Sequence, residues 1–220
     1  MSDINYNKII RNKFALNKFI NKDIPNYKFI KKTGFDIPLD YWLKKILKDL
    51  KKYSSRLQQS HLINNRWENL YLDPYHVPAV KHVFMAASVF AKKITNKPVI
   101  VPHQGLGISF DEFWFNVAKS GESTGWHDHK KKAVISGVYY LDIHDNSGDI
   151  HFRSKVKDKW SEWSLKPETG KMILFDSKLE HSVSENKSCH PRISLAFNLY
   201  TLPLEIQDSS AQYSTDKFFS

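Results

Sequence analysis

The stretch AVISGVYYLDIHDNSGDIHF, residues 133–152, decides the fold class. Residues 133–141 and 149–152 are both rich in the β-branched and aromatic residues that favour strands. The segment Asp145-Asn146-Ser147-Gly148 between them is typical of a turn, because these side chains and glycine suit turn backbones. We therefore predict two strands joined by a tight connection.

The same alternation of short strand and polar turn extends from Pro98 almost to the end of the chain. About eight short strands are typical of a jelly roll. Two amphipathic helices are predicted before them, at about 40–58, with Asp40 as N-cap, and at about 78–95. The predicted fold class is mostly β with N-terminal helices: a double-stranded β-helix (jelly roll) buttressed by helices. The candidate strands are 99–101, 108–117, 125–129, 133–141, 149–152, 171–175, 181–183 and 192–199.

This pattern divides the 220 residues into three regions. We expect residues 1–97 to form a helical, basic region that supports the barrel, 98–203 to form the double-stranded β-helix core, and 204–220 to form a polar tail. No apolar run reaches the roughly 18 residues of a membrane span. The single cysteine, Cys189, cannot form a disulfide within the chain, so we expect a cytoplasmic protein (host cytoplasm if phage-encoded).

The formal net charge of +10 is concentrated in the first 60 residues. That segment has 14 Lys or Arg and 5 Asp. One interpretation is a solvated, lysine-rich surface. The other is a basic arm for nucleic acid or an acidic partner, although no known nucleic-acid-binding motif accompanies it. The sequence leaves both open.

Three histidines form the most specific chemical signal. His127 and His129 lie two residues apart in Trp126-His127-Asp128-His129, and His181 follows on a later predicted strand. Side chains two apart on a strand point to the same face, so His127 and His129 can share one cavity. A third imidazole from another strand would complete a metal site. The other seven histidines receive no role.

The region from Phe113 to Tyr200 resembles the 2-oxoglutarate- and Fe(II)-dependent oxygenases. It is most similar to the prolyl-hydroxylase-like group and to small oxygenases of phages and marine bacteria. Each matching piece is weak alone, but their order and spacing are specific. These pieces are Trp114–Val117, Gly125–His129, Ser136–Leu141, Gly148–Phe152, Gly170–Phe175 with His181, and Arg192–Asn198.

The resemblance implies an enzyme that uses Fe(II), 2-oxoglutarate as co-substrate and O2. Fe(II) would be bound by His127, His129 and His181. Arg192 would bind the far carboxylate of 2-oxoglutarate, because a guanidinium can donate two parallel hydrogen bonds to a carboxylate. Ser194 and Tyr140 would assist, and Asn116 would line the other end of the pocket. No catalytic residue beyond the metal centre is predicted, and the primary substrate stays undetermined between a protein side chain, a nucleobase and a small metabolite.

His129 departs from the family pattern, which commonly has a carboxylate two residues after the first histidine. A regular strand would turn Asp128 to the opposite face, so we expect three histidine ligands. An Asp128 ligand would require a bulge or irregular backbone. A neutral third ligand leaves one more positive charge on the site.

Two other functions remain open from the sequence. A co-substrate-independent three-histidine dioxygenase of the cupin type would share the fold and the ligands but would not need Arg192 and Ser194. A non-catalytic jelly-roll binding module would need no iron. Trp126, Trp160 and Trp163 are candidates for lining a substrate mouth, although large aromatic residues more commonly pack in cores.

Overall fold

The computed structural model describes residues 39–63, 66–129, 133–156 and 159–204. Most of the lysine-rich segment over residues 1–60 and nearly all of the predicted tail lie outside these residues. No helix among the described residues is long and apolar enough to cross a membrane.

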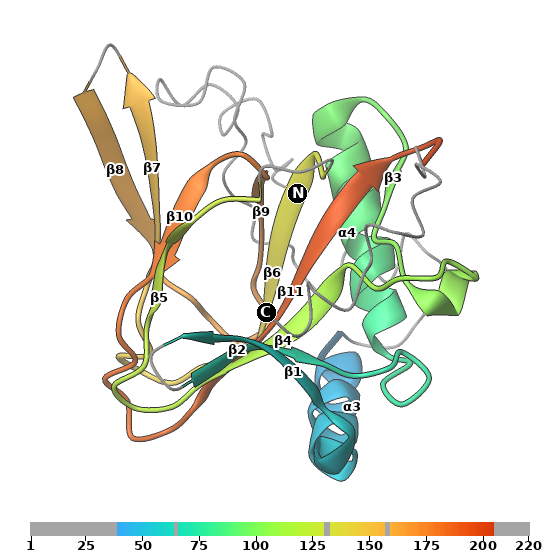
Figure 1. The fold of residues 1–220 in the computed structure, drawn as a ribbon, viewed down its shortest axis with the longest axis horizontal. Helices are drawn as coiled ribbons and strands as arrows, with labels where there is room; N and C mark the ends of the chain where they lie inside the picture. The colour runs from blue at the N-terminus through green and yellow to red at the C-terminus, as the bar shows by residue number, and fades with distance from the viewer. Residues whose placement is uncertain (1–38, 64–65, 130–132, 157–158, 205–220) are drawn as a thin grey trace, which may run out of the picture.

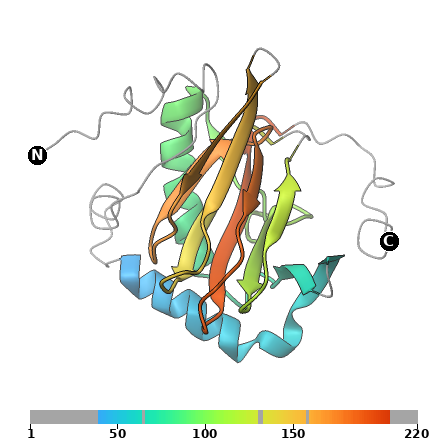
Figure 2. The same ribbon diagram turned by 90° about the vertical axis from the view of Figure 1, so that its left-hand side faces the viewer.

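Two antiparallel sheets face each other, with helices behind the larger one (Figure 1). The large sheet has the order β1-β2-β4-β11-β6-β9, and β3 pairs with β11. The small sheet has the order β5-β10-β7-β8 and faces the viewer in Figure 2. This arrangement confirms the predicted mostly-β fold buttressed by helices. The large sheet contains β1 (Gln58–Ile63), β2 (Arg66–Tyr71), β3 (Val99–Ile100), β4 (Phe113–Ala118), β6 (Ile135–Asp142), β9 (Met172–Asp176) and β11 (Arg192–Thr201), and the small sheet β5 (Thr124–His127), β7 (Ile150–Val156), β8 (Lys159–Leu165) and β10 (Glu180–Val183).

The helices cover the outer face of the large sheet. The α4 helix (Val80–Thr95) buries a broad apolar face, and its C-cap is Asn96, whose left-handed backbone (φ 55°) suits asparagine. The α3 helix (Leu39–Lys52) contributes Ile46 and neighbouring leucines to the same core. Alternate residues of the large sheet face this core, including Tyr139 and Leu195, both with no exposed area.

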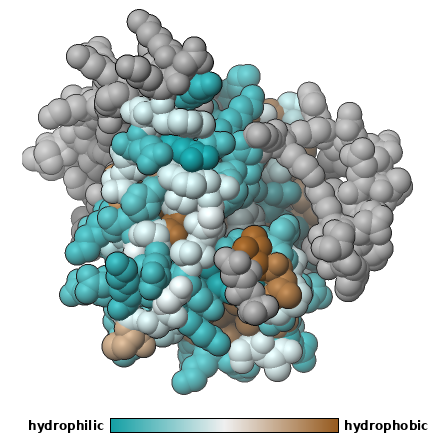
Figure 3. Space-filling view, turned by 60° about the vertical axis from the view of Figure 1, so that its left-hand side comes forward, coloured by the Kyte–Doolittle hydropathy of each residue, from teal (hydrophilic) through white to brown (hydrophobic). Residues whose placement is uncertain are grey.

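A second, smaller core lies between the two sheets. Tyr140 and Phe175 of the large sheet belong to the same buried cluster as Ile150 and Phe152 of the small sheet. Tyr139 and Tyr140 therefore point to opposite faces of β6, as strand alternation requires. The outer surface on the small-sheet side is mainly hydrophilic, with hydrophobic residues in small groups (Figure 3).

Several predicted boundaries were wrong. The helix predicted over 40–58 ends at Lys52, and the β1–β2 hairpin that follows it was not predicted. The strand predicted over 108–117 begins only at Phe113, and the strand predicted over 125–129 ends at His127. The β8 strand was not predicted. The remaining predicted strands and the helix at about 78–95 are found within two residues at most of their ends, except that β7 continues to Val156.

Candidate metal and co-substrate site

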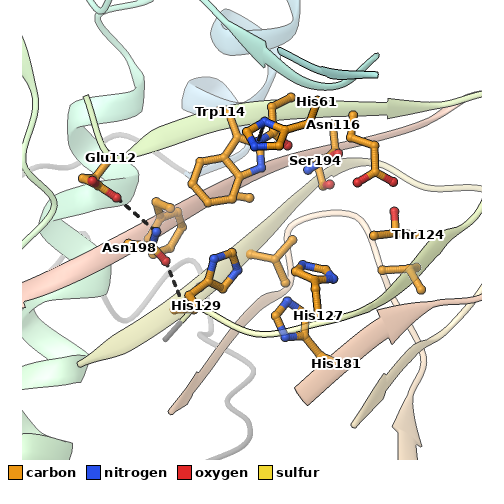
Figure 4. Close-up of a pocket in the computed structure, with 18 of the residues that line it drawn as sticks. His61, Glu112, Trp114, Asn116, Thr124, His127, His129, His181, Ser194 and Asn198 are labelled. Atoms are coloured by element: carbon orange, nitrogen blue, oxygen red, sulfur yellow. Dashed lines mark hydrogen bonds between the residues drawn. The ribbon is translucent and has the colours of Figure 1, made fainter. Parts of the chain in front are cut away.

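A cavity of about 620 Å³ opens between the two sheets. Residues of β5 and β10 line one side, residues of β4, β6 and β11 line the other, and the β1–β2 hairpin contributes part of the wall. All seven residues to which the sequence assigned a ligand or co-substrate role line this cavity. Figure 4 shows the cavity with His127, His129 and His181 at one side and Asn116 and Ser194 on the facing strands.

His127, His129 and His181 point toward one another in this cavity (Figure 4). One ring nitrogen from each lies within 4.8 Å of the other two. The His127 and His181 ring centroids are 4.1 Å apart, and His129 lies 5.2 Å from His181. Three imidazole nitrogens this close can coordinate one divalent ion, so the donor set fits a metal such as iron.

Backbone hydrogen bonds orient two of these rings. His127 Nδ1 bonds the Gly125 carbonyl at 2.9 Å, and His181 Nδ1 bonds the Leu179 carbonyl at 3.0 Å. Because a carbonyl oxygen only accepts, Nδ1 carries the hydrogen in each neutral ring and Nε2 carries the lone pair. This tautomer is the one that a metal-binding histidine with an Nδ1–H to carbonyl bond adopts.

Burial favours the uncharged form of two histidines in the cluster, His129 and His181. Desolvation, followed by the neighbouring histidines, lowers the pKa of His181 well below its ordinary value. Desolvation also lowers the pKa of His129 to about 4. Both rings are therefore neutral near pH 7, and metal binding needs a deprotonated imidazole.

The position of His129 does not come from strand alternation. The β5 strand ends at His127, and the His129 amide donates to the Ser177 carbonyl at 2.8 Å. Among the described residues, the cluster of possible ligands includes His129 and does not include Asp128. The expected three-histidine set is thus brought together, but by irregular backbone after the strand.

Arg192 provides a buried positive charge on the large sheet. It is 4% exposed, and its Nη1 donates to the carbonyls of Ser147 at 2.6 Å and Ser184 at 3.3 Å. Burial lowers its pKa to about 10, so it stays charged at neutral pH. Within the described part of the chain, no carboxylate forms an ion pair with it. A buried cation of this kind needs an anion, and the far carboxylate of 2-oxoglutarate fits that requirement.

The other three co-substrate candidates form a row across neighbouring strands. Ser194 on β11 is the direct cross-strand partner of Asn116 on β4 and of Tyr140 on β6. Directly opposed residues share a face of the sheet, and Arg192 is two residues before Ser194 on that face. The structure therefore gathers a guanidinium, two hydroxyls and an amide on one wall. Burial raises the pKa of Tyr140, so its hydroxyl remains a hydrogen-bond donor.

Sequence reasoning missed Arg66, which supports this wall from behind. Arg66 is buried and forms ion pairs with Glu122 at 3.4 Å and Glu68 at 3.6 Å. Its guanidinium also donates to the Ser123 carbonyl at 2.9 Å and to Asn116 Oδ1 at 3.3 Å. It thereby joins the β1–β2 hairpin to the segment before His127. No local sequence signal marks it, because every partner except Glu68 is more than 45 residues away.

A buried polar network beneath His129 was also missed. Ser136 Oγ donates to Asn198 Oδ1 at 2.8 Å, and Asn198 Nδ2 donates to Glu112 Oε2 at 3.1 Å. All three line the cavity, and Figure 4 labels Glu112 and Asn198 there. The position of Ser136 and Asn198 among apolar residues of β6 and β11 was a possible signal, since a polar residue facing a core usually has a partner.

The three tryptophans proposed for a substrate mouth lie elsewhere. Trp163 packs against Phe152 at a centroid distance of 5.9 Å in the inner core. Trp126 and Trp160 are 38% and 51% exposed and do not line the cavity. The aromatic residues that do line it are Tyr71, Trp114, Tyr140, Phe175, Phe197 and Tyr200.

Comparisons with known proteins agree with this geometry. Residues 112–198 match the model of a family described as "Putative 2OG-Fe(II) oxygenase". A Pseudomonas putida prolyl-4-hydroxylase is similar in structure, with TM-score 0.57, 15% identity, and 88% of this chain and 97% of that chain covered. No curated protein matches the sequence.

Two further solved structures extend the same likeness. A prolyl hydroxylase from Trichoplax adhaerens, solved with a hypoxia inducible factor peptide, has TM-score 0.56 and 14% identity over 88% of each chain. The non-heme alpha ketoglutarate dependent epimerase SnoN of nogalamycin biosynthesis has TM-score 0.60 and 9% identity over 86% of this chain and 81% of that chain. At these identities the structures show the jelly-roll fold, and the family match adds the chemistry.

Residues 112–198, within the strand-rich region, thus match the family model of the 2OG-Fe(II) oxygenases. The protein is a 2-oxoglutarate-dependent oxygenase whose cofactors are Fe(II), 2-oxoglutarate and O2.

Proposed function

We propose that His127, His129 and His181 bind the iron and that Arg192, with Ser194, Tyr140 and Asn116, binds 2-oxoglutarate. The observation that carries this assignment is a buried guanidinium, without a carboxylate ion pair among the described residues, in the same cavity as three convergent imidazoles. When bound, the iron and its co-substrate would supply the oxidising power for the primary substrate.

The chain's own residues prepare that site before any substrate arrives. The carbonyl bonds of His127 and His181 hold Nε2 toward the cavity. The carbonyls of Ser147 and Ser184 hold Arg192, so little side-chain entropy is lost when it meets a carboxylate. The inner core beside Tyr140 excludes water from this end, which strengthens the charge pairing.

We further propose that the primary substrate is a side chain presented by a protein, which the enzyme hydroxylates. The cavity of about 620 Å³ leaves room beyond a five-carbon dicarboxylate, and its wall includes the aromatic Trp114 and Tyr200. Prolyl hydroxylases are among the similar structures, and one of them was solved with a peptide. A screen of peptides for succinate release above the basal rate tests this proposal, and a nucleoside or small metabolite that alone stimulates release would refute it.

Anaerobic titration of the Fe(II)-loaded chain with 2-oxoglutarate tests the site. We expect a weak visible charge-transfer band, and succinate on admission of air. No band and no succinate would refute the assignment.

The cupin-type dioxygenase is the second candidate, because three histidine ligands suit it equally well. Arg192→Ala separates the two: a dioxygenase without co-substrate would keep its activity, whereas the proposed enzyme would lose 2-oxoglutarate turnover. The binding-module alternative predicts no bound iron and DNA binding that falls steeply with salt.

A further inference from the structure

The outward face of the small sheet carries a stacked group directly behind the histidines. The Arg153 guanidinium contacts the rings of both Trp126 and Trp160, 4.4 and 4.5 Å from their centroids. Its Nε also donates to Glu180 Oε2 at 2.6 Å. Arg153 is therefore held by three side chains, although it lies on the surface of the sheet.

Two of these three partners adjoin a histidine of the cluster. Trp126 immediately precedes His127 on β5, and Glu180 immediately precedes His181 on β10. His127 and His181 are themselves cross-strand partners. Because neighbours on a strand point to opposite faces, a side chain that fixes Trp126 and Glu180 outside also fixes the backbone that carries both histidines inside.

The β5 strand has few other contacts that could fix the position of His127. It is an edge strand in the small sheet, and its pairing with β10 has only two registered residue pairs, with an irregularity between them. The pairing of β10 with β7 has four successive pairs. The spacing of His127 from His181 therefore depends on side-chain contacts more than the position of β10 does.

We propose that Arg153 is a positioning residue of the metal centre, whose stack on Trp126 and ion pair with Glu180 hold His127 and His181 at the spacing that one ion requires. The inference rests on the proposed function, since it assumes that these histidines bind metal. Trp160 offers a matched control, because it contacts the same guanidinium from β8 and adjoins no histidine of the cluster.

Titration of the full chain with Co(II), without 2-oxoglutarate, tests the proposal through the visible bands that report coordination geometry. Trp126→Ala and Arg153→Ala are expected to weaken Co(II) binding about tenfold or more and to change the bands, since partners outside the ligand set typically have effects of this size. Arg153→Lys keeps the ion pair but not the planar stack, and its Co(II) affinity should lie between those of the wild type and Arg153→Ala. Trp160→Ala should stay within about twofold of the wild type.

Unchanged Co(II) affinity and bands in Trp126→Ala and Arg153→Ala would overturn the proposal. So would equal losses in Trp126→Ala and Trp160→Ala, because these would indicate general weakening of the sheet. Melting temperatures of the metal-free variants are measured alongside, and if Arg153→Ala is unfolded, the comparison of the two tryptophan variants decides. A wild-type chain that binds no Co(II) would instead refute the metal site itself.

Discussion

Arg192 should contribute to binding through its charge, because it is the buried cation on the co-substrate wall. A hydrogen bond to a charged group contributes about 1.5–3 kcal/mol, so Arg192→Ala should weaken 2-oxoglutarate binding about 10- to 100-fold. Calorimetric titration of the Mn(II)-loaded protein measures this. Lys119→Ala is the control, since it removes an equal charge from an exposed position. Equal losses in both variants would show that net charge, and not this guanidinium, matters.

His129 stands where the family commonly has a carboxylate, and its identity as third ligand can be tested directly. His129→Asp should retain Fe(II), because a carboxylate is an equally suitable ligand for this ion. His129→Ala should bind Fe(II) at least about tenfold more weakly, and His181→Ala should not retain it. Metal analysis after gel filtration gives the stoichiometry. Full Fe(II) retention by His129→Ala would exclude His129 and point to Asp128.

His103 lies outside the site and should give the protein a pH-dependent stability. It is 3% exposed, its Nδ1 has no hydrogen-bond partner, and burial with nearby Lys81 lowers its pKa to about 4. The unfolded chain binds this proton near pH 6.5, so between pH 6.5 and 4 the unfolded state binds more protons and the free energy of unfolding falls as pH falls.

Urea denaturation at pH 7 and pH 5 measures the effect. The decrease in unfolding free energy should be smaller in His103→Gln than in the wild type. His190→Gln, which changes an exposed ring, should retain the wild-type decrease. Parallel pH dependences in all three proteins would contradict the assignment to His103.

At the scale of elements, the turn before β7 explains how Arg192 is held. Gly148 has φ +88°, and a Cβ there would lie 2.3 Å from the Ser184 carbonyl oxygen and 2.9 Å from Arg192 Nη1. Gly121 has a similar φ of +84° but nothing within 4 Å of its Cβ position. Gly148 is therefore required by close approach as well as by backbone conformation.

Substitution of these two glycines separates crowding from backbone strain. Both Gly→Ala variants should lose about 1–2 kcal/mol from the left-handed backbone. Gly148→Ala should lose about 1–3 kcal/mol more through overpacking. It should also raise the KM for 2-oxoglutarate, which Gly121→Ala should leave unchanged. Denaturant unfolding measures the stability loss, and steady-state kinetics measure the KM. Equal stability losses in the two variants would show that the turn at Gly148 can move to accommodate the added methyl group.

The elements that sequence reasoning found and missed differ in how local their signals are. β9 is apolar from Met172 to Phe175, and β6 and β11 are largely apolar, because both faces of these strands are covered. β1 reads Gln58-Gln59-Ser60-His61-Leu62-Ile63, without apolar alternation, and pairs with β2, whose partner β4 is over 40 residues away. Leu57 continued the helical spacing, so the predicted helix was extended past Lys52. Such an element is defined by tertiary pairing that no local pattern shows.

The candidate site was predictable for a similar reason. His127, His181, Arg192, Ser194 and Tyr140 lie on strands where parity sets the direction of each side chain. His129 was expected in the cluster because a strand over 125–129 would turn it to the same face as His127. The strand ends at His127, so the position of His129 was predicted correctly but for an incorrect reason. Arg66 could not be predicted, because its contacts are long-range.

At the scale of the whole molecule, the two halves of the site belong to different sheets. His127 and His181 come from the small sheet, whereas Arg192, Ser194 and Tyr140 come from the large sheet. A metal held by the three histidines would contact only the small sheet and the segment just after β5. 2-Oxoglutarate that binds both the metal and Arg192 would link the two sheets across the cavity.

This division predicts an order of stabilisation. Mn(II), a redox-stable substitute for iron, should raise the melting temperature by itself. 2-Oxoglutarate should add a further rise only when Mn(II) is present, since its affinity depends on the metal. A ligand at 100 times its Kd stabilises by about 2.7 kcal/mol, which is readily measured by thermal scanning.

The Arg192→Ala variant locates the second step. It should keep the rise caused by Mn(II), because the histidines are intact, and lose most of the rise caused by 2-oxoglutarate. Succinate, which has two carboxylates but no keto group for chelation, serves as the ligand control and should stabilise the wild type less than 2-oxoglutarate. A full 2-oxoglutarate effect without Mn(II), or in Arg192→Ala, would show that the co-substrate does not bridge the sheets through this arginine.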